Sequence, residues 1–286
     1  MEDILLLFNE TFFKKNGIIT VNSAKDIPNK DSILFIGSHR YTFNPQKILE
    51  YFEPISKKPF TYSIICGKTD RCLSKDIDIP DNIKKIYCNN VDYTHDIIKF
   101  LPMGRDFRAR DCFHKSAQKR GRDILAYGNF SLNTSWIRKA IYLFIKDNPI
   151  YTLENIGSRG CNGSKRSWFM PNDDFFKRLR SSKFVICPRG TAPDSFRFYD
   201  TLYCGAIPIV IKDPMYDQFD HSELPILFLD HQKDFQKITE NFLNEQYNIL
   251  SKKIKPYYKT LDFDYWIEKI KKESKEFDNI IKKHIK

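Results

Sequence analysis

The stretch SKFVICPRGTAPDSFRFYDTLYCGAIPIVIKD, residues 182–213, predicts a strand, a glycine-containing turn, a helix and a second strand. Its first apolar run ends at a Pro-Arg-Gly turn, after which Asp194 or Ser195 can cap a helix. Gly205 can end that helix, and Ile207–Ile211 forms the next apolar run. Because the amides at a helix N-terminus attract anions, this arrangement predicts an anion site behind the turn.

The order of these residues resembles the C-terminal half of the exostosin-like glycosyltransferases of family 47. Proteins of that family carry a strand ending in Cys-x-Pro-x-Gly, a Ser-Phe-Arg sequence that opens a helix, and a Gly-Cys-Ile-Pro-Val-type entry into the next strand. Ala206 stands where the family usually has cysteine, and Asp200 where it often has glutamate. Weaker similarity extends over Arg122–Leu143. The matching residues are Cys187, Pro188, Gly190, Ser195, Phe196, Arg197, Asp200, Gly205, Ile207, Pro208 and Ile209.

Strand and helix signals alternate along both halves of the chain, which predicts parallel sheets covered on both faces. A polar, basic segment at Phe113–Arg122 separates the halves as a candidate linker. We expect strands at Ser32–Gly37, Thr61–Cys66, Asn82–Cys88 and Asp123–Tyr127, and helices at Pro45–Phe52, Ser135–Lys146, Asp173–Ser181 and Asp264–Lys286, besides those of the opening stretch.

The predicted fold class is therefore α/β. The resemblance implies the GT-B class, in which two Rossmann-like domains face each other across a cleft. We expect residues 1–115 to form an acceptor-side domain and residues 116–255 to form a nucleotide-sugar donor domain. Residues 256–286 would then form a C-terminal helix that packs back toward the first domain. Ligands of open α/β sheets bind beyond the carboxyl ends of the strands.

Composition narrows the class of protein. Seven cysteines without a C-x-x-C pair indicate reduced thiols rather than a disulfide framework or a zinc site. No apolar segment approaches the roughly twenty residues of a membrane span, and the acidic start before Ile4–Phe8 is unlike a signal peptide, so we expect a cytoplasmic protein. The net charge of +11 owes much to lysines in Lys252–Lys286 that alternate with acids. This pattern is typical of a solvated helix face and makes nucleic acid an unlikely partner.

The donor that the resemblance implies presents a diphosphate, which needs positive charge throughout the reaction. Arg197, in the first turn of the predicted helix, offers a planar fork of donors suited to phosphate oxygens. Gly190 would let the backbone approach, and the amides near Ser195 and Phe196 would face the phosphates. Asp200, at i, i+3 from Arg197, could accept hydrogen bonds from the ribose hydroxyls. The alternative is a surface salt bridge between Arg197 and Asp200 with no ligand.

Three further segments are expected to contribute to the donor site. Arg189 either lines the nucleotide pocket or points to solvent. The loop with Gly128 and Asn129 follows a predicted strand where GT-B donor domains approach the diphosphate. Arg138 matches an arginine of the family pattern, although a single helical arginine is usually solvated.

Transfer with inversion needs a base that removes the proton of the acceptor hydroxyl. The resemblance places that base in the first domain, near the ends of its strands. His39 and Asp92 are the candidates, with His95 as a further possibility. A histidine at a strand end is more often structural.

Two Asp-x-Asp triplets, Asp76–Asp78 and Asp262–Asp264, do not follow apolar strands. We interpret the first as loop and the second as a helix cap. A GT-B site stabilises the leaving diphosphate with arginine and helix amides, so we predict no metal site and no required cofactor.

The predicted function is an inverting glycosyltransferase that moves a sugar from a UDP-sugar to a hydroxyl of a glycan acceptor. Members of the family use UDP-xylose among several other donors, and the sequence does not choose among them. A GDP-fucose-dependent fucosyltransferase is the second enzyme hypothesis, although such enzymes usually carry Glu-Lys where this chain has Phe196-Arg197. A non-catalytic glycan-binding or nucleic-acid-binding protein is the alternative from another class.

Overall fold

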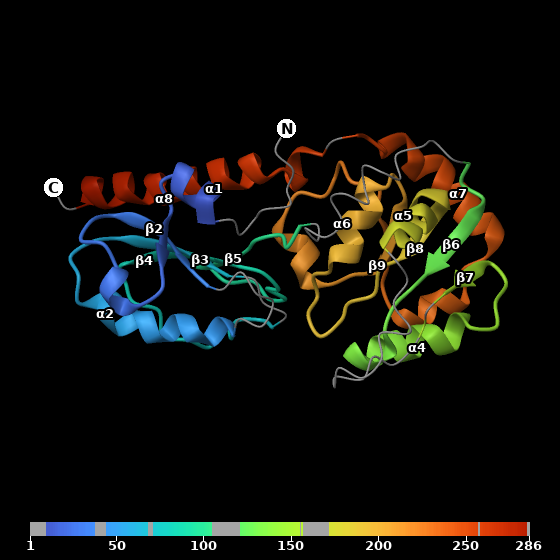
Figure 1. The fold of residues 1–286 in the computed structure, drawn as a ribbon, viewed down its shortest axis with the longest axis horizontal. Helices are drawn as coiled ribbons and strands as arrows, with labels where there is room; N and C mark the ends of the chain where they lie inside the picture. Colours follow the sequence, from blue (N-terminus) through green and yellow to red (C-terminus); the bar gives the residue numbers. More distant parts are fainter. Residues whose placement is uncertain are drawn as a thin grey trace. The chain divides into compact units, whose positions relative to one another are not determined.

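The computed structural model describes residues 10–37, 44–67, 71–104, 121–154, 156, 172–256 and 258–284. The chain divides into two compact units, each built around a parallel five-stranded sheet (Figure 1). Unit 1 comprises Met1–Met103, Pro214–Asp220 and Lys259–Lys286, and unit 2 comprises Gly104–Asp213 and His221–Tyr258. The α/β class with two Rossmann-like units is thus confirmed. The predicted boundary at residues 115 and 116 lies outside the described residues.

The sheet of unit 1 is wound in one direction. Its strands are β1 (Ile19–Val21), β2 (Ser32–Ile36), β3 (Tyr62–Cys66), β4 (Ile83–Cys88) and β5 (Ile98–Phe100), and they lie side by side in chain order. Right-handed crossovers place successive connections of such a sheet on one face. Figure 1 shows α2 (Phe52–Ser56), which follows η3 (Pro45–Tyr51), on one side, with α1 (Glu10–Lys15) and α8 (Phe263–His284) on the other.

The final helix covers the face that the crossovers leave open. The Tyr87 hydroxyl donates to Glu273 Oε2 at 2.5 Å, and Ser274 Oγ donates to Ser63 Oγ at 2.9 Å. On the same helix Trp266 and Ile270 are buried. The C-terminal helix is therefore a structural part of unit 1. The short helices η2 (Ala24–Asp26), η6 (Pro214–Gln218) and η9 (Lys259–Leu261) also belong to this unit.

The sheet of unit 2 reverses direction, with strand order β10-β9-β8-β6-β7. Its strands are β6 (Ile124–Gly128), β7 (Tyr151–Leu153), β8 (Ser182–Ile186), β9 (Ile207–Ile211) and β10 (Leu227–Leu229). Its helices are η5 (Leu132–Thr134), α4 (Trp136–Ile145), α5 (Asn172–Ser181), α6 (Phe196–Tyr203), η7 (Gln232–Gln236), α7 (Glu240–Leu250) and η8 (Ser251–Lys253). Since the crossovers after β6 and β8 run in opposite directions, α4 and α6 cover opposite faces. No helix among the described residues combines the length and the apolar character that a bilayer crossing needs.

A glycine and an arginine stabilise the end of α6. Gly205 has φ +68, a left-handed backbone conformation that residues with a side chain rarely adopt. A Cβ atom there would lie 2.8 Å from Arg122 Nη2. Arg122 donates to Ser182 O at 2.6 Å and to Cys204 O at 2.9 Å, so it satisfies carbonyls at the start of β8 and the end of α6. The last residue of the predicted linker is thus an anchor of the unit 2 sheet.

The Gly205→Ala variant is expected to unfold at clearly lower urea concentration than the wild type. The left-handed conformation costs a residue with a Cβ about 1–2 kcal/mol, and displacing Arg122 adds the loss of its hydrogen bonds. Gly17→Ala is the matched control, because Gly17 has φ +75 and open space around its Cβ position. Equal destabilisation of the two variants would show that the contact with Arg122 contributes nothing.

Candidate functional site

The direction of unit 2 changes between β6 and β8, which pair with each other in parallel. The chain leaves β6 toward β7 on one side, and leaves β8 toward β9 on the other. Such a switch point opens a crevice at the carboxyl ends of the two strands, where open α/β sheets bind their ligands. The loop 128–131 follows β6 and the loop 187–190 follows β8, so the topology brings together two segments that the sequence assigned to the donor site.

Arg138, on α4, ties these two loops together. It donates from Nε to Arg189 O and from Nη2 to Pro188 O, both at 3.0 Å, and from Nη1 to Ser131 O at 3.5 Å. The residue is only 8% exposed, so the expectation that a single helical arginine is solvated is wrong here. A Cβ at residue 190 would lie 3.1 Å from Arg138 Nη2, so close packing against Arg138 favours glycine here.

Arg189 does not simply point to solvent. Its Nη1 lies 2.7 Å from Asp213 Oδ2, and the two side chains are 30% and 9% exposed. Both residues follow neighbouring strands, β8 and β9, so the ion pair braces the carboxyl edge of the sheet beside the switch point.

The helix α6 begins beyond the second loop, with Ser195 as its N-cap in an extended conformation. The Ser195 side chain makes no capping hydrogen bond. The neighbouring Asp194 Oδ2 accepts a hydrogen bond from the Tyr199 hydroxyl at 3.0 Å. Phe196 opens the helix, and the guanidinium of Arg197 lies 5.9 Å from the centre of the Phe175 ring. Arg197 is half-buried in the first turn.

Asp200 is not a surface residue, because only 5% of it is exposed. Burial raises the pKa of the neighbouring Cys187 thiol to about 12, Arg197 and Arg138 oppose this shift, and Asp200 adds to it. The charges of Arg197, Arg138 and Asp200 therefore all influence the buried Cys187 thiol at the end of β8. The Cys187 thiol stays protonated at neutral pH, and its sulfur lies 3.4 Å from Thr201 Oγ1.

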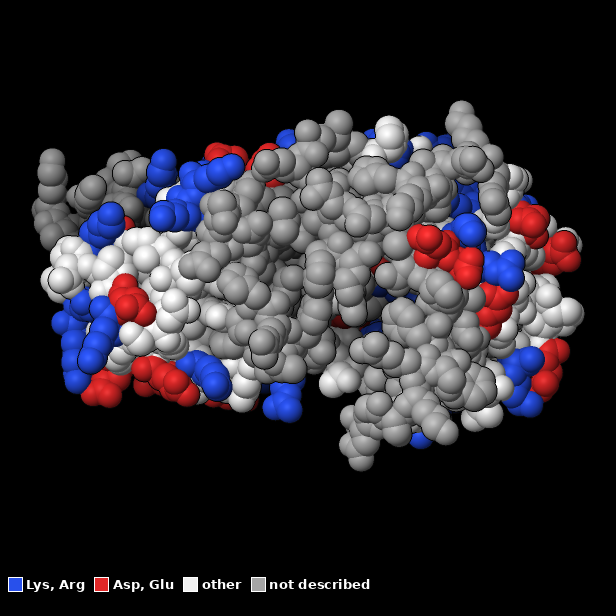
Figure 2. Space-filling model, in the orientation of Figure 1, with Lys and Arg blue, Asp and Glu red and all other residues white. Residues whose placement is uncertain are grey.

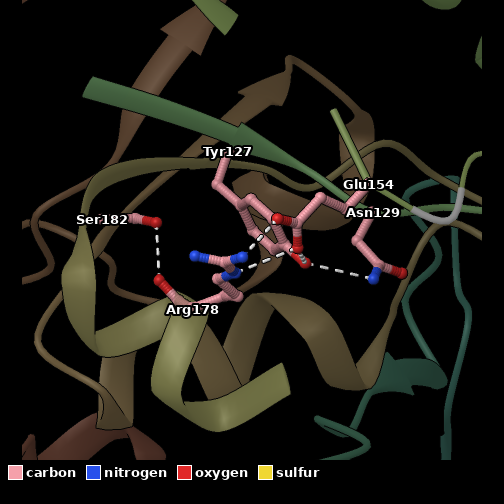
Figure 3. Close-up of polar contacts among 5 residues, drawn as sticks. All are labelled: Tyr127, Asn129, Glu154, Arg178 and Ser182. Carbon is pink, nitrogen blue, oxygen red and sulfur yellow. Dashed lines mark hydrogen bonds and ion pairs between the residues drawn. The ribbon is translucent and has the colours of Figure 1, made fainter. Parts of the chain in front are cut away.

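A polar network that the sequence analysis missed lies at the ends of β6 and β7 (Figure 3). The buried Tyr127 hydroxyl accepts from Asn129 Nδ2 at 3.2 Å and donates to Glu154 Oε2 at 3.3 Å. Glu154 is held by two nitrogen atoms of Arg178, at 3.1 and 2.7 Å. Burial raises the pKa of Tyr127 to about 12, and the nearby charge of Arg197 opposes the rise. The network fixes the side chain of Asn129, a predicted site residue, beside the switch point.

The proposed base residues belong to unit 1. His39 lies outside the described residues. Asp92 is half-buried and follows β4 by a turn in which Asn90 has φ +61 and is fully buried. That turn is held by Gln218 of η6, whose Nε2 donates to Val91 O at 2.7 Å. Asparagine adopts this left-handed conformation more readily than most other residues with a side chain.

The other candidates have structural roles. His95 Nδ1 accepts from the backbone amides of Ile97 and Ile98 at 3.0 and 3.1 Å, so this nitrogen supports the start of β5. Asp262 Oδ1 accepts from Asp264 N at 2.9 Å at the start of α8, as a helix cap does. Among the described residues, no group of three or more His, Cys, Asp or Glu side chains is arranged to hold a metal ion.

The chain resembles known proteins in sequence and in fold. The model of the exostosin GT47 domain matches residues 88–233, just over half of the chain. No curated protein matches the sequence. Among solved structures, the α,α-trehalose 6-phosphate synthase of Burkholderia multivorans is similar, with a TM-score of 0.53 and 8% identity over 92% of this chain and 74% of that chain. This likeness concerns the fold alone and is consistent with GT-B architecture. The chain therefore belongs to the exostosin GT47 family and is a glycosyltransferase.

Proposed function

We propose that this glycosyltransferase moves a sugar from a UDP-sugar to a hydroxyl of a glycan acceptor with inversion at the anomeric carbon. The observation that carries the proposal is the position of Arg197. It stands in the first turn of α6, the helix that follows the loop bound by Arg138 at the switch point of unit 2. UDP-xylose is one candidate donor among those that the family uses.

The diphosphate would lie against Gly190 and the first amides of α6, near Ser195 and Phe196. The positive end of the helix and the fork of Arg197 would stabilise the negative charge that grows on the leaving UDP as the sugar bond breaks. Arg189 would contribute less, because Asp213 already neutralises its charge. These groups need no metal ion or cofactor to act on a diphosphate.

The remaining donor residues would act around this core. Gly128 allows Leu153 to pack against the end of β6, since a Cβ at residue 128 would lie 2.7 Å from Leu153 Cδ2. The amide of Asn129 has a fixed direction because its nitrogen binds Tyr127. Asp200 would accept hydrogen bonds from the ribose only at its small exposed edge. Its negative charge also favours the Arg197 cation one helical turn away.

Asp92→Asn and His39→Asn, prepared separately, test the base. In one of the two, turnover is expected to fall by at least about a hundredfold, in line with the loss of general base catalysis. UDP affinity is expected to stay within about twofold, because neither residue belongs to unit 2. Initial rates and calorimetric titration with UDP measure the two quantities. Full activity of both variants would place the base elsewhere.

Calorimetric titration of the full chain with UDP, GDP and a panel of UDP-sugars, with and without Mg²⁺, tests the donor. Metal-independent binding of UDP and preference for one UDP-sugar are expected. Preference for GDP would favour the fucosyltransferase alternative. Absence of any nucleotide binding would favour a non-catalytic protein, for which a glycan and nucleic-acid screen is the next measurement. Among the described residues on the face drawn in Figure 2, Lys and Arg side chains are interspersed with Asp and Glu side chains.

A further inference from the structure

One tryptophan of unit 2 is largely in solvent. Trp136, the first residue of α4, is 66% exposed, although tryptophan is a residue that usually buries most of its surface. A single exposed apolar residue is not by itself informative. The exposure of Trp136 is informative because of the position of this residue in the fold.

The backbone around Trp136 is attached to the proposed diphosphate loop on both sides. Before it, Thr134 O accepts from Thr191 Oγ1 at 3.5 Å, and the Cβ position of Gly190 lies 3.7 Å from Thr134 Oγ1. After it, Arg138 binds the carbonyls of Pro188 and Arg189.

Ser135, between these anchors, caps α4 by accepting from Ile137 N at 3.2 Å. The indole is thus carried by a rigid backbone at the carboxyl edge of the sheet, within two residues of groups that contact the loop 188–191.

We propose that Trp136 is a stacking platform for a pyranose ring of the acceptor glycan. The face of an indole carries negative charge density, and the C–H bonds on the face of a pyranose carry a small positive charge, so the two surfaces attract and also shield apolar area from water. The inference rests on the proposed function and deepens it, because it places acceptor recognition on the unit that would bind the donor.

The surroundings favour a sugar over a membrane or a protein surface. Leu143, two turns along α4, is 62% exposed, but the exposed Lys139 stands between it and Trp136. An apolar face that inserts into lipid or docks on a protein is contiguous. A single indole flanked by polar side chains instead suits a ligand whose ring face is apolar and whose edge carries hydroxyls.

Tryptophan fluorescence tests this without requiring turnover. The wild type is titrated with cellohexaose, xylohexaose and maltohexaose, and the same titrations are made with Trp136→Ala, Trp136→Phe and Leu143→Ala. Of the two tryptophans in the described residues, Trp266 is buried at 2% exposure, so Trp136 is the accessible reporter there. We expect at least one glycan to change the wild-type and Leu143→Ala spectra, and no such change in Trp136→Ala.

Kinetics with the responding glycan then separate stacking from a structural role. In Trp136→Ala the acceptor KM is expected to rise about tenfold, equivalent to about 1.4 kcal/mol, with kcat and UDP affinity unchanged and partial recovery in Trp136→Phe. An unchanged acceptor KM, or a parallel loss of UDP affinity, would overturn the inference. If the wild type binds UDP but none of the three glycans, the stacking role of Trp136 is overturned and the proposed function is not. If the wild type does not bind UDP, the proposed function itself is contradicted. Binding to phosphatidylcholine vesicles that is lost in Trp136→Ala would also overturn it.

Discussion

The Arg197→Ala variant is expected to lose at least about a hundredfold in affinity for UDP and to lose turnover altogether. Hydrogen bonds to a charged partner contribute about 1.5–3 kcal/mol each, and a guanidinium fork makes two of them to one phosphate group. The loss in turnover exceeds the loss in binding because the charge on the diphosphate grows in the transition state. Calorimetric titration with UDP and initial-rate assays measure the two effects.

Two control variants make this result specific. Lys237→Ala removes the same charge from an exposed side chain of unit 2, and UDP affinity should not change. Arg197→Lys keeps the charge but not the fork, and an intermediate affinity is expected. The melting temperature of Arg197→Ala should fall moderately, because the variant loses the contact with the Phe175 ring, worth about 1 kcal/mol, and the cation beside the buried Asp200. Wild-type UDP affinity in Arg197→Ala would remove this residue from the donor site.

The sequence predicted the inner strands of both sheets and missed the outer ones. The apolar runs of β2, β3, β4, β6, β8 and β9 are five or six residues long and were placed within one or two residues of their observed bounds. The outer strands β1, β5, β7 and β10 have three residues each. A run of three cannot show a period, and an outer strand needs burial on fewer sides, so neither length nor composition marks it.

The site shows a similar division. Ser195, Arg197 and Gly190 were predicted as site residues because each carries a local signal: a cap, a charge in a first turn and a glycine after a strand. Asp213 and Glu154 were not found, because their partners lie 24 residues away in the sequence and no spacing rule links them. The burial of Asp200 and Arg138 was equally invisible, since it depends on how α4 and α6 pack around the end of β8.

The second large effect is expected for Arg138→Met, which keeps the packing volume of the side chain but removes its donors. The carbonyls of Pro188 and Arg189 would lose charge-assisted partners at a buried position, so the free energy of unfolding should fall by about 3 kcal/mol or more. Urea denaturation measures it. Lys139→Met is the matched control, because the next residue of the same helix is exposed.

Arg138→Met also separates positioning from direct contact with the donor. Arg138 is 8% exposed and binds the loops 128–131 and 187–190 through their backbones, so its removal should weaken UDP binding only by letting those loops move. Stability and UDP affinity should therefore fall together, and Arg138→Lys, which can reach only one carbonyl at a time, should lie between wild type and Arg138→Met in both. In Arg197→Ala the two quantities should separate, with a large loss of affinity and a smaller loss of stability. If Arg138→Met loses UDP affinity at unchanged stability, Arg138 contacts the nucleotide itself, and its assignment as a positioning residue is wrong.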